Sequence, residues 1–169
     1  MDFSAPPTGT LTVSPPLNPQ EIAFLRSFSA SRRMRRREGP YSTREDVPYD
    51  DLGPVDYNRP HEGQPGLSCN WEPTDDGAGI RWDGSTSFDH ADEWLQYIVD
   101  HFLRPGAVAQ HLADSSQRPD QVDFSAFTFD HHVNGELHGQ VEYCCDWQAH
   151  CILTVEEDTV RIRYERPRQ

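Results

Sequence analysis

Hydrophobic residues recur along the chain with two spacings, one typical of helices and the other of strands. The longest helical pattern covers residues 91–103, where apolar side chains fall at the i, i+3, i+4 and i+7 spacing of one helix face. Pro105 and Gly106 follow it and predict the end of this helix. We expect Ser87 or Asp89 to cap its start, because a short side chain with an acceptor oxygen satisfies the free amides of the first turn.

Another helix is predicted to begin after Asn18. Asn18 is a favourable N-cap, Pro19 suits the first helical position, and Glu21 completes a capping box. This helix is expected to run into the arginine cluster at 32–37. Its apolar stripe consists of Ile22, Phe24, Leu25 and Phe28.

Alternating apolar and polar residues predict the strands. Residues 9–13 form one short strand, and two more lie on either side of an Asp76-Gly77 turn, which is a strong hairpin signal. A later hairpin is predicted at 151–165.

The segment 126–143 is predicted to be a further hairpin with its turn at Asn134-Gly135. A two-residue turn there mixes the two faces, whereas a three-residue loop that begins at Val133 keeps one face apolar. We therefore prefer the three-residue loop. In this register His131 faces inward, as a hydrogen-bonded core histidine.

The preferred register also gathers two histidines and two carboxylates on the polar face of that hairpin. It places Asp130 opposite His138 and His132 opposite Glu136. Such a group can bind a divalent metal or exchange a proton, so these four residues are the candidate catalytic set. The solvated face of a half-buried antiparallel sheet carries the same residue types, and we favour that interpretation.

The predicted order of elements is β-α-β-β-α-β-β-β-β. This order indicates an α+β fold in which a mostly antiparallel sheet carries two main helices on one face. The 169 residues suit a single domain, 1–169. Two parts of it lack a strong pattern: a long irregular loop at about 38–66, and a polar, partly helical excursion at about 107–123.

Charge is unevenly distributed along the chain. The net charge is −13, yet residues 1–44 carry +4 and residues 45–155 carry −17. The arginines Arg32, Arg33, Arg35, Arg36 and Arg37 have the geometry to grip phosphates. A strongly acidic body repels polyanions and membrane surfaces, so we expect no nucleic-acid partner and no membrane contact. A protein partner of complementary charge is favoured instead.

No run approaches the roughly 18 apolar residues that a membrane span requires, and we expect the protein to be cytoplasmic. Its four cysteines are then reduced thiols. Three of them lie in CCDWQAHC at 144–151, which contains no pair with the C-x-x-C spacing of a structural zinc site. We therefore expect no metal and no cofactor.

Two stretches resemble a family of small uncharacterised proteins of bacteria and their phages. They are DYNRPHEGQPGLSCNWEPTDDGAGIRWDG at 56–84 and EWLQYIVDHFL at 93–103, and Ser68 stands where the family usually has tryptophan. FSASRRMRR at 28–36 and the later Asn134-Gly135 strand are also similar to that family. No known activity accompanies the resemblance, so it implies no function.

The resemblance includes the loop 56–66 and indicates that its sequence follows a family pattern. This loop holds candidate ligand-binding residues. They are Asn58, Arg59 and Gln64, beside Arg33 and Trp71. The same polar side chains can instead cap the backbone of the loop, which is the interpretation we favour.

The sequence leaves three classes of function open. The leading hypothesis is a non-enzymatic interaction module, an accessory protein of a mobile element, because no catalytic motif accompanies the charge asymmetry. The alternatives are a small metal-dependent hydrolase that uses the His/carboxylate face, and a small-ligand-binding protein.

Overall fold

Seven strands form one sheet in the computed structural model, which describes residues 1–36, 38–43, 49–50, 53–54, 57–113, 122–143 and 147–166. The strands of this sheet are β1 (Asp2–Phe3), β2 (Thr8–Ser14), β5 (Trp71–Pro73), β6 (Gly79–Trp82), β7 (His132–Tyr143), β8 (Trp147–Glu156) and β9 (Thr159–Glu165). Their order is β5-β6-β2-β7-β8-β9, and β1 pairs with the far end of β7. Every pairing is antiparallel, which confirms the predicted α+β class.

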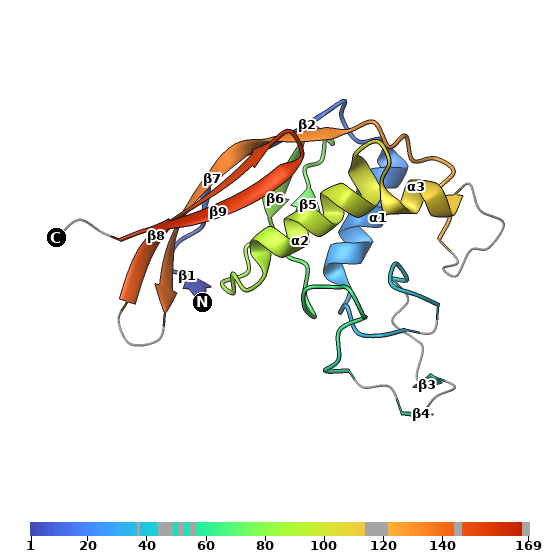
Figure 1. Ribbon diagram of the computed structural model, residues 1–169, viewed down its shortest axis with the longest axis horizontal. Coiled ribbons are helices and arrows are strands. Elements are labelled where there is room, and N and C mark those ends of the chain that lie inside the picture. Colours follow the sequence, from blue (N-terminus) through green and yellow to red (C-terminus); the bar gives the residue numbers. More distant parts are fainter. Residues whose placement is uncertain are drawn as a thin grey trace.

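The helices lie on one side of this sheet (Figure 1). They are α1 (Pro19–Ala30), α2 (Ala91–Ile98), its π-helical continuation η1 (Val99–Leu103) and α3 (Val108–Ala113). Helix α1 contacts β5, α2 contacts β5 and β9, and η1 contacts β7. Two short strands, β3 (Tyr49–Asp50) and β4 (Gly53–Pro54), pair with each other away from the sheet. Among the described residues, no helix is both long and apolar enough to cross a membrane.

The core lies between the helices and the inward face of the sheet. Alternate residues of β7 point inward, and Val133, Leu137 and Val141 are all buried. Aromatic rings fill the space below them, with Phe102 at 5.0 Å from Phe24 and 5.2 Å from Phe28. Burial of each such side chain stabilises the fold by about 1.5–3 kcal/mol.

Helix α1 begins as predicted and ends earlier than predicted. The Asn18 side chain accepts from the Glu21 amide at 2.9 Å, and the Glu21 carboxylate accepts from the Asn18 amide at 2.9 Å, which completes the capping box. The helix stops at Ala30 with Ser31 as its C-cap, so the arginine cluster follows the helix instead of continuing it.

Helix α2 occupies the predicted residues but has a different start. The predicted caps are wrong, because His90 is the N-cap residue and no side chain caps the helix. Asp89 accepts from the Ser87 hydroxyl at 3.2 Å and from the Met1 amino group at 3.3 Å. At the other end Arg104 is the C-cap and Gly106 has φ +78°, so the helix ends where Pro105-Gly106 predicts.

The predicted hairpin at 126–143 is wrong. Residues 132–143 form one continuous strand, and Asn134-Gly135 lies inside it instead of in a turn. Gly135 has φ +143°, and a Cβ there would lie 2.1 Å from the Thr10 carbonyl oxygen, so glycine is needed for β2 to approach. Asn134-Gly135 resembles a turn sequence, but here the glycine allows close pairing of β7 with β2.

The predicted pairing of the four polar residues fails with that hairpin. His138 lies in register with Thr8 on β2 and Ile152 on β8, and Glu136 lies in register with Thr10 and Thr154. Asp130 precedes the strand, and the C-terminal half of the sheet has three strands where four were predicted.

Candidate functional site

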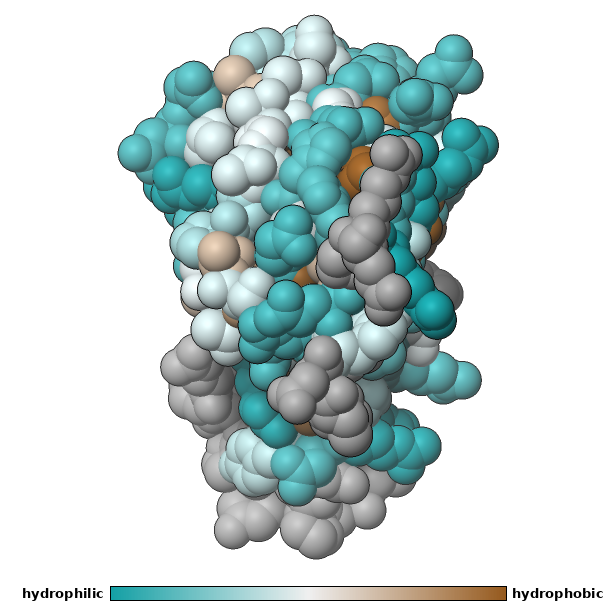
Figure 2. All heavy atoms as spheres, turned by 90° about the vertical axis from the view of Figure 1, so that its left-hand side faces the viewer, coloured by the Kyte–Doolittle hydropathy of each residue, from teal (hydrophilic) through white to brown (hydrophobic). Residues whose placement is uncertain are grey.

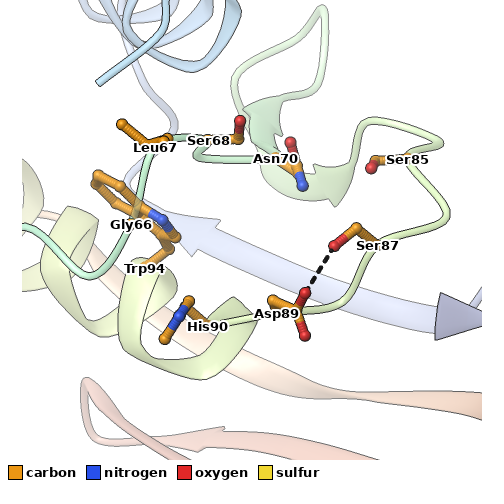
Figure 3. A pocket seen from close by; sticks show the side chains of 9 residues that line it. All are labelled: Gly66, Leu67, Ser68, Asn70, Ser85, Ser87, Asp89, His90 and Trp94. Atoms are coloured by element: carbon orange, nitrogen blue, oxygen red, sulfur yellow. Dashed lines mark hydrogen bonds between the residues drawn. The ribbon is translucent and has the colours of Figure 1, made fainter. Parts of the chain in front are cut away.

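A pocket of about 240 Å³ opens where two segments face each other at the start of helix α2. One wall is the segment 66–70, which leads into β5, and the other is the segment 85–90, which leads into α2 (Figure 3). The lining residues are Gly66, Leu67, Ser68, Asn70, Ser85, Ser87, Asp89, His90 and Trp94. Most of these residues are polar and short, and Leu67 and Trp94 add apolar surface to the lining.

Trp94 contributes the one chemically unusual group of this pocket. The residue is only 1 % exposed, and its indole Nε1 has no hydrogen-bond partner among the described residues. Trp71 and Trp82 differ, because their Nε1 atoms donate to the carbonyls of Ala91 at 2.7 Å and Ser85 at 2.6 Å. A buried donor without a partner costs about 1–3 kcal/mol of folding free energy, and an acceptor that bonded to this indole would recover part of that cost.

Gly66 and His90 flank that indole nitrogen. A Cβ at position 66 would lie 3.7 Å from Trp94 Nε1 and 3.4 Å from His90 Cδ2. The nitrogen edge of the Trp94 ring is turned toward the His90 and Asp89 side of the pocket in Figure 3. The absence of a side chain at 66 therefore keeps space beside the donor.

His90 stands in a strained backbone conformation at the rim. Its φ of +59° is left-handed, which costs a residue other than glycine about 1–3 kcal/mol. Its ring is half exposed, and Nδ1 lies 3.4 Å from Glu93 Oε1. This long contact with Glu93 is the one side-chain hydrogen bond of the His90 ring among the described residues.

Serine, histidine and aspartate all line the pocket, but they do not form a hydrolytic relay. A relay needs the serine hydroxyl bonded to the histidine and the histidine bonded to the aspartate. Here Ser87 donates directly to Asp89, and His90 faces Glu93.

None of the ligand-binding residues predicted from the loop lines this pocket, and they bond to the protein itself. Arg33 is 1 % exposed and donates to the carbonyls of Pro40 at 3.1 Å and Ser42 at 2.7 Å. Gln64 donates to the same Pro40 carbonyl at 2.7 Å and to the Tyr97 hydroxyl at 3.2 Å.

The other three are also placed by contacts within the fold. Asn58 accepts from Arg32 at 3.2 Å, and the Arg59 carbonyl accepts from the Arg35 amide at 3.1 Å. Trp71 is buried against β6. Only the segment that follows this loop, from Gly66 onward, enters the pocket.

The four residues of the predicted His/carboxylate set separate into different contacts. Glu136 and His138 bond to each other, and His138 also bonds to His150 of β8 at 2.9 Å. His132 bonds to Asp158 at 2.7 Å, and Asp130 accepts from Thr128 at 2.5 Å. Sequence reasoning missed His150, because the wrong register gave it no strand partner.

The arginine cluster and the cysteines are divided between surface and interior. Arg33 and Arg36 are buried, whereas Arg32 and Arg35 are exposed, and Arg37 lies outside the described residues. Cys69 and Cys151 are buried thiols, and burial raises the pKa of Cys69 to about 11. Cys144 and Cys145 lie outside the described residues. Within the described part of the chain, no three metal-ligating side chains converge on one point.

Comparisons with known proteins return no match: no family model, no curated protein and no solved structure is similar to this chain.

Proposed function

We propose that the protein binds a small polar molecule, neutral or cationic, in the pocket between segments 66–70 and 85–90. The observation that supports this proposal is the buried Trp94 Nε1, which has no partner within the described structure although it lines the pocket. Buried polar groups in proteins are almost always hydrogen-bonded, so an unpaired donor at a cavity points to a partner from outside.

The lining restricts the size and the chemistry of that partner. The volume of about 240 Å³ corresponds to about eight water molecules in the liquid, which suits a molecule smaller than a nucleotide. The molecule carries an acceptor oxygen for Trp94 and hydroxyl or amino groups for the serines and Asp89.

The carboxylates around the pocket disfavour anions, although one of them, Asp89, pairs with the Met1 amino group at 3.3 Å. Asp89 lies in the wall, Asp92 and Glu93 follow in the first turn of α2, and Asp83 precedes the 85–90 segment. Burial raises the pKa of Asp83, with a further contribution from Glu72 nearby. Carboxylates this dense favour a neutral polyol, sugar or amide, or a primary amine, over a phosphate or a carboxylate.

The face of the molecule in Figure 2 gives less support to a large apolar interface. Figure 2 shows the side of the molecule at the left of Figure 1, where hydrophilic side chains dominate and hydrophobic ones form only small separate spots. An obligate docking surface is more hydrophobic than this. The binding of a protein partner by complementary charge remains the second candidate, motivated by the −17 charge of residues 45–155.

The test is a thermal-shift and fluorescence screen of sugars, polyols, amides and amines against four proteins. These are the wild type, Trp94→Phe, Gly66→Val and Trp147→Phe. Trp94→Phe removes the donor and keeps an aromatic ring, and Gly66→Val fills the space beside the indole. Trp147→Phe is the control, since Trp147 lies at the β7–β8 hairpin end and lines no part of the pocket.

We expect a ligand that stabilises the wild type and the control while it binds Trp94→Phe about 2- to 13-fold more weakly, since a lost hydrogen bond is worth about 0.5–1.5 kcal/mol. Gly66→Val should also weaken binding, because its side chain occupies the space beside the indole. Equal binding to all four proteins would contradict the proposed site. A ligand set made up of phosphates and carboxylates would contradict the charge argument.

A further inference from the structure

Strand β9 forms one margin of the sheet, and among the described strands it pairs with β8 alone. At its start the outer edge is closed by helix α2. The Val160 amide points away from β8 and donates to the Gln96 side chain at 2.8 Å, and Gln96 also donates to the Asp158 carbonyl at 3.0 Å. The C-terminal half of β9 extends past α2, so this closure covers only the first residues of the edge (Figure 1).

The backbone of Ile162 faces the part of the edge that α2 does not close. Successive residues of an antiparallel strand direct their backbone groups alternately to the two sides, so Ile162 faces the same way as Val160. Within the described residues the Ile162 amide has no hydrogen-bond partner. Such a strand edge is a template for pairing with another strand.

The side chains at this end of β9 carry opposite charges on one face. Arg163 and Glu165 lie on the outward face, because Ile162 before them packs against the core. Their side chains are 65 % and 57 % exposed, and Arg163 Nε lies 3.6 Å from Glu165 Oε1. Between them Tyr164 faces the other way and is 40 % exposed. The segment therefore presents one positive and one negative side chain next to each other along the strand.

This charge pattern is complementary to itself in one register. We consider the two-fold pairings of β9 with a second copy that keep the outward faces of both copies on one side. One residue then lies on the axis, and residues equally distant from it face each other. An axis at Arg163 or at Glu165 sets like charges directly opposite, and an axis at Ile162 sets Arg161 opposite Arg163. An axis at Tyr164 sets Arg163 opposite Glu165 of the second copy, twice.

We propose that the edge of β9 from Ile162 onward pairs antiparallel with the same edge of a second copy, about a two-fold axis at Tyr164. The two Arg163–Glu165 pairs occupy the non-hydrogen-bonded positions, where opposite side chains lie closest. Opposite charges at facing positions stabilise strand pairing. Because each copy offers the same edge, association stops at the dimer. The paired segment is short, and interfaces of small area are typical of weak, reversible association.

The experiment is sedimentation equilibrium of the full chain at concentrations from about 10 µM to about 1 mM, the range of weak association. In about 0.15 M NaCl the Debye length is about 8 Å, so the repulsion between two chains of net charge −13 is largely screened. The variants are Arg163→Glu, Glu165→Arg and the matched control Arg161→Glu. Arg161 lies on the same face of the same strand, but no residue of β9 faces it in the pairing about Tyr164.

We expect a monomer–dimer equilibrium in the wild type. Arg163→Glu and Glu165→Arg should each weaken dimerisation at least about fourfold, because two favourable pairs become two repulsive ones, and Arg161→Glu should keep the wild-type constant. An equal mixture of Arg163→Glu and Glu165→Arg should associate again, since each chain then meets the opposite charge at both pairs.

Four outcomes overturn the proposal. They are a wild type that stays monomeric throughout, a species larger than the dimer, equal weakening in Arg161→Glu, and a mixture that associates as weakly as the single variants. Far-ultraviolet circular dichroism verifies that each variant is folded.

Discussion

His131 is a histidine held in the core by acceptors on both sides of its ring. Nε2 lies 2.7 Å from the Glu21 carboxylate, and Nδ1 lies 2.6 Å from the Pro15 carbonyl, with both His131 and Glu21 only 1 % exposed. Burial alone lowers the pKa of His131, but the hydrogen bonds to Glu21 and Pro15 and the charge of Glu21 outweigh it and raise the pKa above the usual 6.5. The prediction that His131 faces inward is confirmed, although the hairpin register from which it was drawn is wrong.

The raised pKa makes the stability of the protein depend on pH in a definite direction. The folded state holds the His131 proton more tightly than the unfolded state, so this contribution is complete below about pH 6.5. It is lost as the pH rises through the folded pKa. Urea unfolding measured from pH 6 to pH 9 should show a free energy of unfolding that falls across this range.

His131→Gln is the variant that isolates this effect. We expect a free energy of unfolding lower by about 3–5 kcal/mol at pH 6, because Glu21 is left buried without its charged partner. The fall between pH 6 and pH 9 should be absent in this variant. A fall of the same size would assign it to another group. His101 acts in the opposite sense, because burial lowers its pKa to about 4, so its contribution to stability is lost as the pH falls below about 6.5.

At the scale of elements, the N-terminus of α1 shows how much one capping residue contributes to the free energy of unfolding. Asn18 serves two elements at once, since Oδ1 caps the helix and Nδ2 donates to the Ala126 carbonyl at 2.8 Å. Asn18→Ala should lower the free energy of unfolding by about 0.5–2 kcal/mol through the lost cap. Asn18→Asp keeps an acceptor for the Glu21 amide and should lose less. Chemical denaturation of both variants measures the two losses of unfolding free energy. An equal loss in Asn18→Ala and Asn18→Asp would show that the hydrogen bond to the Ala126 carbonyl contributes more than the cap.

The elements that the sequence predicts well are those whose signals are local. The Asn18 capping box, the 3.6-residue spacing of 91–103 and the turns at Asp76-Gly77 and Glu157-Asp158 all lie within a few residues of what they specify. The turn predicted at Asn134-Gly135 was wrong because glycine is required there by the close approach of β2, which lies more than a hundred residues away in the chain. A local pattern does not distinguish a turn from a glycine needed for close pairing.

The candidate pocket could not be predicted from the sequence for the same reason. Its walls come from segments about twenty residues apart. The atom on which the proposal rests is Trp94 Nε1, which has no hydrogen-bond partner among the described residues. In the sequence Trp94 is one of several residues of an apolar helix face, and its ring does pack in the core against Phe28 and Tyr97. Likewise, Glu136 and His138 were predicted to share one polar face but with the wrong cross-strand partners, and only the true register brings in His150.

At the scale of the whole molecule, the first residues of the chain connect the pocket to the sheet. Phe3 lies on β1 beside β7, and its amide donates to the Thr86 carbonyl at 2.7 Å, in the 85–90 wall. Its ring lies 4.3 Å from that of Phe88. Gly139 of β7 makes room for it, since a Cβ there would lie 2.3 Å from Phe3 Cε1.

This contact predicts that the pocket wall can be loosened from the sheet side without a change to any lining residue. Phe3→Ala should lower the free energy of unfolding by about 3–5 kcal/mol, and Gly139→Ala should act in the same direction by pushing the ring away. In both variants, hydrogen exchange should accelerate at the amides of Phe3 and Phe88 more than in α1, because these amides bond across the released contact. Leu25→Ala is the control, since it weakens the core within α1 itself. Acceleration spread evenly over the molecule in all three variants would mean that β1 unfolds only with the whole domain, and the wall would then be as rigid as the sheet that supports it.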